Sequence, residues 1–541
     1  SRTSVPVACV GCRSRHLKCS GGPRCARCIA DGLNCSYVKS RRGFKGPRKR
    51  PAADQMDRFQ QQDASFDQFG SCRASVVLQQ GGSSPHVLGA GILTTQNQLR
   101  YDPRAVQSLR DTNLPNTTSA FLHNFYSAHP FLLPRDQLLD LLRSKRVPYL
   151  ETAIHYIGSC FLPNVSTHVW EGALNQALLQ PESPKDPHAV QALLLYAIGL
   201  KANDYTEKSQ EVLAKAVDLA LSLGMNERNF AIQHSEGNPL VEESWRRTWY
   251  ELYVIDGFFA ALNQKQTFRL RDVISDVGLP CEEAEYASGC IPRPKTFHDY
   301  EDAAFMDDEV QFSSFTFRID AVRNLGRVLA VSRPDLLDSR AIEVVDSYLV
   351  NWGLHLPASK KEVITRDGQL DHMLFQAHMI ANGAMILLHK PRSDLDEIRS
   401  VDDIKTCVAP GEPFLATQTR EYHTAKCMEA SQELSKLIRL PSPLERYTPF
   451  FTCVVVMSSV VYLSYWSFIV PDGEDGPIKE LIRLNTGVLK SLAVQWPVAK
   501  TVLGQVKGVA QEMFSSKRAT SLHWNGVAAA DLLQMIEDDG S

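Results

Sequence analysis

The spacing of hydrophobic residues divides this chain of 541 residues into unlike parts. From about Thr118 onward, apolar side chains recur every three or four residues, which is the period of an amphipathic helix. In residues 211–223 the apolar stripe ends directly before Gly224, and glycine commonly ends helices. A second stripe runs through Trp245, Trp249 and Phe259. Because strand-like alternation is scarce, the pattern predicts a large all-α domain over residues 118–515.

Residues 51–117 show no sustained hydrophobic period and are rich in Gln, Ser, Gly and Asp. This composition is typical of a disordered linker, which we expect to join the two ends of the chain. No run of three heptads follows the N-terminal segment, so a coiled coil is not expected there. A homodimer would have to form through the helical domain, and a monomeric mode stays open.

Residues 449–470 form a stretch of 22 residues without a charge, which is long enough to cross a membrane. Seven of these residues are Ser, Thr or Tyr, and no basic cluster flanks the stretch. Both features favour a helix buried inside the all-α domain. We therefore expect no membrane partner.

Charge is divided as unevenly as hydrophobicity. The whole chain has a formal net charge of −3, but residues 1–50 carry thirteen Lys and Arg against one acid, Asp31. The first 50 residues therefore sum to +12, and the other 491 residues, with 45 basic and 60 acidic groups, sum to −15. A cationic segment at one end of an anionic chain suggests a contact with a polyanion at that end.

Six of the thirteen cysteines fall within 27 residues and form two halves of identical spacing, C-x2-C-x6-C. These are Cys9, Cys12, Cys19, Cys25, Cys28 and Cys35. A closed structural zinc site takes four ligands, so six thiolates satisfy two Zn2+ ions if one thiolate from each half bridges. A secreted disulfide framework is the rival interpretation. Residues 1–30 contain no apolar signal segment and the remaining cysteines are scattered, so a reducing compartment is favoured.

The segment from Cys9 to Cys35, with Arg13-Ser14-Arg15-His16-Leu17-Lys18 in the first half and Pro23 before the fourth cysteine, resembles the fungal Zn(2)-C6 binuclear zinc cluster. The resemblance implies a small two-zinc module with two short helices over residues 1–38. It also implies that Cys9 and Cys25 are the bridging ligands. Metal binding would supply most of the folding free energy of such a module, about 10 kcal/mol.

The two halves of the repeat differ in charge. The first carries Arg13, Arg15, His16 and Lys18, whereas residues 29–34 of the second contain no base and one acid. We therefore expect the first half to face double-stranded DNA. The resemblance implies major-groove reading of a CGG-type triplet by a lysine in the position that His16 occupies here. Arg15 can instead bind guanine O6 and N7 in a bidentate manner.

Residues 39–50 follow the cluster as a basic arm with Gly and Pro. Arg41, Arg42 and Lys45 are expected to contact DNA along a groove or the backbone, and the arm has the composition of a nuclear-import signal. A solvated charged linker is the alternative. The combination of a DNA-binding head and an import signal predicts a nuclear location.

Several motifs of the all-α domain resemble the fungal-specific transcription factor domain over roughly residues 118–510. They are Leu122-His123-Asn124-Phe125-Tyr126, Ala220-Leu221-Ser222-Leu223-Gly224, Glu243-Ser244-Trp245-Arg246-Arg247 and Leu387-Leu388-His389-Lys390-Pro391. Within them we expect Arg246, Arg247 and Asp256 to hold helices together by ion pairing. Catalytic motifs are not found, so no enzyme activity is expected, and His378 and His389 are interpreted as hydrogen-bonded core histidines.

Residues 531–539 at the C-terminal tail, 516–541, alternate acids with bulky apolar residues. This is the composition of an activation segment that folds against a coactivator, or equally of a terminal helix ending in solvated acids. Together the features predict a nuclear, sequence-specific regulator of RNA polymerase II genes, with a secondary-metabolite pathway favoured over nutrient catabolism. The alternative is a helical ligand-binding or enzymatic body whose zinc head serves only for localisation.

Overall fold

The computed structural model describes Cys19 and residues 24–30, 116–163, 165–303, 310–332, 339–395, 419–471 and 475–520. It separates into two units, one within residues 1–81 and one within residues 82–541, and each is described by itself. The predicted basic arm, the linker up to residue 115 and the tail from residue 521 lie outside the described residues. In the first unit the described secondary structure is one helix, α2 (Ala26–Ala30).

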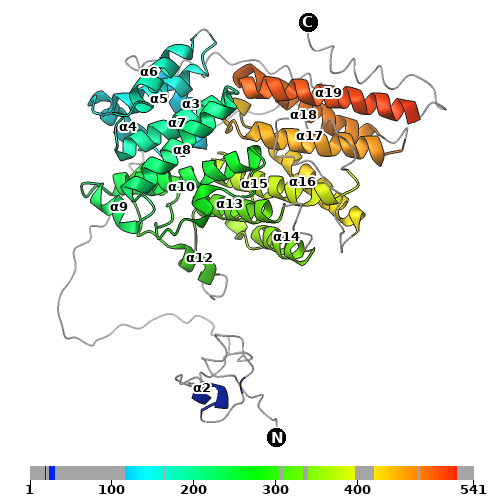
Figure 1. Ribbon diagram of the computed structural model, residues 1–541, viewed down its shortest axis with the longest axis horizontal. Helices are drawn as coiled ribbons and strands as arrows, with labels where there is room; N and C mark the ends of the chain where they lie inside the picture. Colours follow the sequence, from blue (N-terminus) through cyan, green and yellow to red (C-terminus); the bar gives the residue numbers. More distant parts are fainter. Residues whose placement is uncertain are drawn as a thin grey trace, which may run out of the picture. The chain divides into compact units, whose positions relative to one another are not determined.

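The second unit is largely helical in its described residues, which contain no β-strand and only an isolated bridge between Ile364 and Leu370. The expected all-α class is therefore confirmed for this part of the chain. Figure 1 shows its helices gathered into successive groups along the sequence. The first group comprises α3 (Asn116–Asn124), α4 (Arg135–Arg143), α5 (Pro148–Ser159), α6 (His168–Leu178), α7 (Pro187–Ala202), α8 (Thr206–Leu223) and α9 (Arg228–Gln233).

The long helix α10 (Pro239–Leu262) joins this first group to the second, because it contacts α7, α8 and α9 on one side and α13 on the other. The second group comprises α11 (Glu283–Ser288), α12 (Phe297–Ala303), α13 (Ser314–Val331), α14 (Ser339–Leu354), α15 (His372–His389) and α16 (Arg420–Ile438). The last group comprises α17 (Phe451–Phe468), α18 (Gly476–Gln495) and α19 (Pro497–Thr520). Single turns of 3-10 helix lie between them: η2 (Tyr126–Ala128), η3 (Arg269–Asp272), η4 (Ala358–Lys360), η5 (Lys390–Arg392) and η7 (Leu444–Arg446).

Both apolar stripes singled out in the sequence form helices with the expected buried face. In α8, Val212, Ala216 and Ala220 are buried, and the helix ends at Gly224, whose φ of 77° is left-handed. The N–H of Met225 then bonds to the carbonyl of Ala220 at 3.0 Å. This bond gives a partner to a carbonyl group that the last turn of the helix leaves without one. In α10, Trp245 and Trp249 are buried as the stripe predicts.

The uncharged stretch forms α17, which is long and apolar enough to span a membrane by composition. In the folded chain it packs against α15, α16, α18 and α19, and 78% of its apolar window is buried. Two of its polar side chains are paired with other helices: the Tyr462 hydroxyl bonds to Ser435 at 2.7 Å, and Asn485 of α18 donates to Ser458 at 2.8 Å. The expectation of a buried helix is confirmed.

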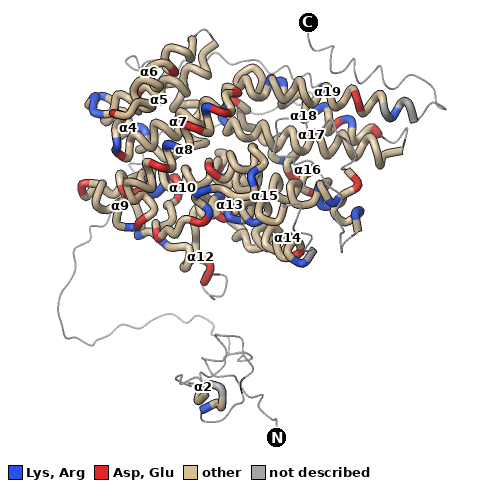
Figure 2. Tube along the Cα trace, viewed as in Figure 1, with Lys and Arg blue, Asp and Glu red and all other residues tan. Residues whose placement is uncertain are grey.

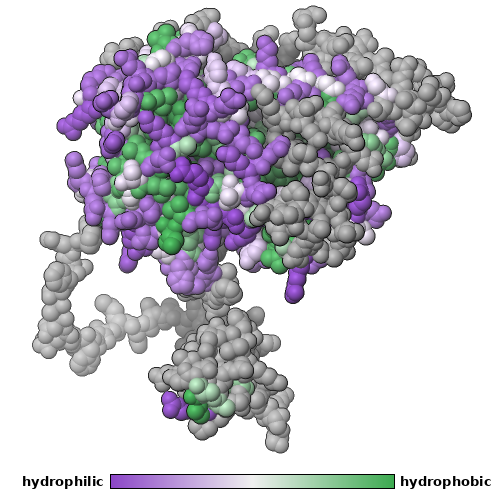
Figure 3. Space-filling model, in the orientation of Figure 1, coloured by the Kyte–Doolittle hydropathy of each residue, from purple (hydrophilic) through white to green (hydrophobic). Residues whose placement is uncertain are grey.

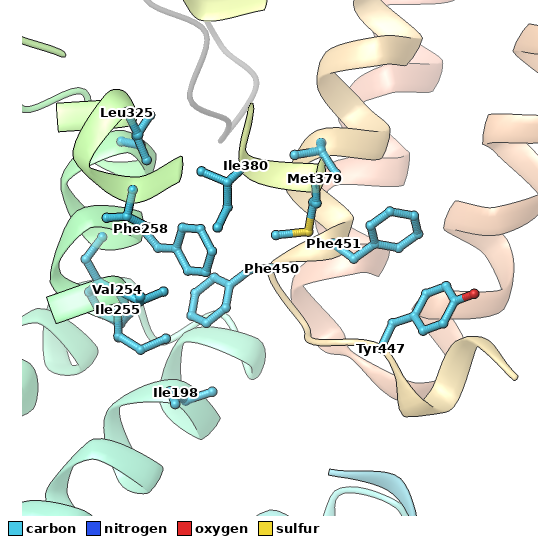
Figure 4. Packing of buried hydrophobic residues seen from close by; sticks show 14 of the residues in the cluster. Ile198, Val254, Ile255, Phe258, Leu325, Met379, Ile380, Tyr447, Phe450 and Phe451 are labelled. Carbon is cyan, nitrogen blue, oxygen red and sulfur yellow. The ribbon is translucent and has the colours of Figure 1, made fainter. Parts of the chain in front are cut away.

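The groups of helices share one hydrophobic core. Phe450, which precedes α17, lies between side chains of α10 and α15, with its ring 4.9 Å from that of Phe258 (Figure 4). Small apolar cavities flank it, and both are lined by Leu262, Phe450 and Cys453. Figure 3 shows that the visible face of the helical body is mostly hydrophilic, with hydrophobic side chains gathered in smaller areas between.

Of the three residues expected to hold helices together by ion pairing, Arg246 and Arg247 form ion pairs, but only Arg247 reaches another helix. Arg246 and Arg247 each bind Glu243 at 2.9 Å within α10, and Arg247 also reaches Glu283 of α11. The expectation is wrong for Asp256. Its carboxylate accepts the backbone N–H of Leu270 at 2.8 Å, so it holds turn η3 against α10 through a hydrogen bond. Burial raises the pKa of this carboxyl group, and the backbone bond opposes that rise.

A charged cluster that was not predicted lies at the centre of the helical body. Glu251 of α10 binds both Nη atoms of Arg318 from α13, at 2.5 and 3.0 Å, and the side chains are fully buried. His129 lies 2.7 Å from the same carboxylate through Nδ1, and Thr448 lies 3.1 Å from its Nε2. Because a carboxylate only accepts, Nδ1 carries the proton and Nε2 accepts from the hydroxyl group. The cluster therefore joins η2, α10, α13 and the segment before α17.

Candidate metal centre and nucleic-acid interface

The described part of the first unit gathers three of the six predicted zinc ligands. Cys25 and Cys28 are fully buried, and Cys19 packs against them. Cys25 directly precedes α2, and this position brings its sulfur within 3.4 Å of the backbone nitrogen of Cys28. The C-x2-C spacing thus places the two cysteines in one buried cluster at the start of α2.

The composition of this cluster fits a shared zinc centre. Cys19 belongs to the first half of the repeat and Cys25 to the second, so sulfurs from both halves meet, as bridging requires. Thiolates are the preferred ligands of structural Zn2+. Cys9, Cys12 and Cys35 lie outside the described residues. Within the part that the structure describes, no group of three or more Cys, His, Asp or Glu is arranged so that it could hold a metal ion.

Among the described side chains of helix α2, those of Ala26, Ile29 and Ala30 are exposed, and Ile29 is 62% exposed. The predicted DNA contacts lie outside the described residues: Arg13, Arg15, His16, Lys18, Arg41, Arg42 and Lys45.

Figure 2 shows Lys and Arg interspersed with Asp and Glu along the described helices of the body. Several of these charges are paired on the same helix, as in Arg143 with Asp140 at 2.9 Å and Lys479 with Asp475 at 2.9 Å. Paired charges on a surface contribute little attraction for a distant polyanion. The excess of basic residues is therefore concentrated in the N-terminal 50 residues, which are the candidate nucleic-acid interface.

The histidines of α15 differ in a way that the sequence did not indicate. His389 is fully buried; its Nε2 lies 3.2 Å from Asp346 and its Nδ1 lies 2.7 Å from Nδ1 of His423. Burial lowers the pKa of His389, and burial together with His389 lowers the pKa of His423 to about 4. His389 is thus a hydrogen-bonded core histidine, as expected. The same expectation is met only in part by His378, which has a backbone hydrogen bond with Lys360 but whose Nε2 is buried without a partner among the described residues.

These features define a class of protein: one chain that combines a small cysteine-rich module with a large all-α body and has its basic charge concentrated in the N-terminal segment. Residues 7–43 match the fungal Zn(2)-Cys(6) binuclear cluster domain, and residues 119–319 match the fungal specific transcription factor domain. The matched cluster domain binds two zinc ions. This class of transcription factor normally carries no enzyme activity.

The chain is similar along its whole length to the C6 finger domain transcription factor iacK of Pestalotiopsis fici. The two are 34% identical over 584 residues, which cover 100% of this chain and 86% of iacK. The chain therefore belongs to the fungal Zn(2)-Cys(6) transcription factor family. It is also 33% identical over 107 residues to the transcription factor rglT of two Aspergillus fumigatus strains, covering 19% of this chain and 24% of rglT. No solved structure matches the chain.

Proposed function

We propose that this transcription factor acts in the nucleus as a sequence-specific regulator of RNA polymerase II genes and reads a short GC-containing element in the major groove. The observation that carries the proposal is the asymmetry of the cysteine repeat, in which both halves have ligand spacing but the first alone has a basic stretch. The burial of Cys25 and Cys28 beside Cys19 supports a shared metal centre that fixes this basic stretch.

Each half supplies three ligands in this proposal, and Cys9 and Cys25 are the bridging pair. The remaining ligands are Cys12, Cys19, Cys28 and Cys35. Six thiolates and two Zn2+ ions together add −2 to the +12 of residues 1–50, so the head keeps a charge of about +10. The head therefore stays cationic after metal binding and attracts DNA, whereas the body at −15 does not.

Arg15 is assigned to base reading because its guanidinium group can donate two hydrogen bonds to guanine O6 and N7. Arg13 and Lys18 are assigned mainly to phosphates, and His16 lies at the position of the base-reading lysine in related clusters. Arg41, Arg42 and Lys45 extend the phosphate contacts along the arm. The imidazole of His16 is a weaker donor to guanine than an ammonium group, so a CGG-like triplet depends on Arg15.

Binding-site selection from random duplex DNA by the full-length, zinc-loaded chain tests this assignment. The proposal expects enrichment of a short motif containing a CGG-like triplet. Enrichment of no motif, or of motifs made only of A·T pairs, would contradict it. A homodimer through the helical body would add a second half-site, and sedimentation equilibrium of the same preparation reports the oligomeric state independently.

The regulated genes are proposed to belong to one pathway, with secondary-metabolite biosynthesis favoured over nutrient catabolism because regulators of this family commonly serve single pathways. Comparison of transcripts from cells with and without the gene tests this. Loss of transcripts from one contiguous set of biosynthetic genes supports the proposal, whereas changes confined to nutrient-use genes contradict it.

The C-terminal tail is proposed to bind a coactivator, since residues 531–539 alternate acids with bulky apolar side chains. Deletion of residues 531–541 should reduce activation of a reporter carrying the selected DNA element. Activation that remains unchanged at equal protein level would remove the coactivator proposal and leave the DNA-binding proposal intact.

A further inference from the structure

A pocket of about 350 Å³ lies between helices α14, α15 and α16. Its volume is within the range of sites that bind small molecules, roughly 300–1,000 Å³. The apolar lining comes from all three helices: Trp352 and Leu356 at the α14 end, Ala381 and Met385 of α15, and Ala430 of α16. The Trp352 indole is fixed, because its N–H donates to the carbonyl of Phe317 at 3.2 Å.

One buried polar atom in this lining has no partner among the described residues. His378 lines the pocket, its ring is 5.4 Å from that of Trp352, and its Nε2 is buried without a hydrogen bond among the described residues. A backbone hydrogen bond with Lys360 favours the charged form of the ring, but it leaves Nε2 without a partner. An unsatisfied buried nitrogen costs roughly 1–3 kcal/mol, and a ligand that bonds to it recovers this.

The charges around the pocket favour a ligand without net charge. Lys361 and Lys426 are balanced by Glu429 and Glu433. Lys426 lies 3.8 Å from Asp346, and Glu433 lies 2.5 Å from Lys436, so two of these four charges already have partners. Burial lowers the pKa of His378, so its imidazole is neutral and suits a hydroxyl group rather than an anion.

We propose that this pocket binds a small uncharged molecule with a flat apolar body and one hydroxyl group, which bonds to Nε2 of His378 while the body packs on Trp352. The apolar side chains bury the ligand body, and the histidine fixes its orientation. The site is separate from the cysteine module, so it gives the helical body a ligand-binding role that DNA recognition does not require.

The test uses 2-naphthol and naphthalene, which differ by a single hydroxyl group, in calorimetric titrations of the full-length, zinc-loaded chain. The proposal expects saturable binding of 2-naphthol at one site and binding of naphthalene that is about threefold to tenfold weaker, the value of one hydrogen bond. H378F should bring the two ligands to equal affinity while keeping the ring contact with Trp352. Absence of saturable 2-naphthol binding would overturn the proposal.

A381F fills the pocket and should abolish binding of both ligands. M385W provides a second blocked variant if the first fails to fold, and thermal unfolding of each variant checks this. K361Q is the matched control at the mouth and should bind 2-naphthol as the parent chain does. If 2-naphthol still binds to both A381F and M385W, the ligand binds at another place. If K361Q no longer binds it, the ligand is recognised by charge. Either result contradicts the proposal.

Discussion

Individual buried charges hold the helical body together in specific pairs. Glu251 and Arg318 lie on α10 and α13, separated by 67 residues in the sequence, and both side chains are inaccessible to solvent. Burial alone would raise the pKa of Glu251, but Arg318 and His129 outweigh it and lower the pKa to about 2. The pair therefore remains ionised, and neither residue is readily replaced without its partner.

Substitution E251Q should destabilise the chain by about 3–5 kcal/mol at neutral pH, because Arg318 is left buried without an opposite charge. The lowered pKa of Glu251 also gives a pH dependence. The ionised carboxylate stabilises the fold above the unfolded value near 4.5, and this contribution is lost as the pH falls from there through about 2. Urea unfolding of the parent and E251Q chains, followed by circular dichroism, should show that the variant lacks this acid-dependent loss.

The exposed pair of Arg143 and Asp140 supplies the control for that measurement. Asp140 is 75% exposed, so D140N should change the free energy of unfolding by less than about 0.5 kcal/mol. A loss below 1 kcal/mol in E251Q would contradict the role given to the buried cluster.

Base reading and phosphate binding should separate at neighbouring residues of the head. R15A should reduce discrimination between the selected triplet and a mutated triplet by about 1–3 kcal/mol. K18A should instead weaken both sequences equally and lower the slope of log affinity against log salt by about 1. Fluorescence anisotropy at several salt concentrations measures both quantities. If R15A weakens all sequences uniformly, the base contact assigned to Arg15 is wrong.

At the scale of single residues, contacts between residues that are close together in the sequence could be predicted. Contacts between residues on distant helices could not. The C-x2-C spacing sufficed to place Cys25 and Cys28 side by side. The partners of Arg318 and Asp256 could not be predicted, since they are set by how the helices cross. A buried arginine in a helix with apolar neighbours signals that an acid must lie nearby, but it does not identify Glu251.

The helices of the body follow from hydrophobic period and capping residues, while their packing depends on close approaches that the period does not show. Gly158 near the end of α5 is one such position, because a Cβ atom there would overlap the backbone carbonyl of Thr117 in α3. Gly172 of α6, in contrast, faces open space. Replacement by alanine should therefore change the stability of the chain in opposite directions at these two glycines.

G158A should destabilise the chain by about 1–3 kcal/mol, because α3 must move away from α5. G172A should stabilise it by roughly 0.5–1 kcal/mol, since alanine restricts the unfolded chain and favours a helix. Urea unfolding of both variants gives the comparison. Equal effects of the two substitutions would show that α3 and α5 do not approach as closely as described.

Element boundaries also differ slightly from the hydrophobic pattern. Helix α3 begins at Asn116, two residues before the start expected for the helical domain, and α19 continues to Thr520, five residues beyond the expected end. The first and last turns of a helix carry weak hydrophobic signals, because few of their side chains reach the core. The uncharged helix α17 was correctly assigned to the interior because its Ser and Tyr residues imply partners inside a protein.

The whole molecule combines a cationic zinc head and an anionic helical body, and the net charge of −3 conceals this division. The family and the all-α class of the described body were predictable, because the cysteine repeat and the helical period are local signals. The pocket beside His378 was not predictable, since it depends on the arrangement of three helices around residues that are far apart in the sequence.

The affinity of the full-length chain for its selected DNA element, measured with and without zinc, tests the role of the head most directly. We expect tight binding that is lost on chelation and restored by Zn2+, loss of binding in C25A, and parent-like binding in C290A, because Cys290 is an exposed cysteine outside the cluster. Binding by the zinc-free chain or by C25A with the affinity of the parent chain would contradict the proposed mechanism.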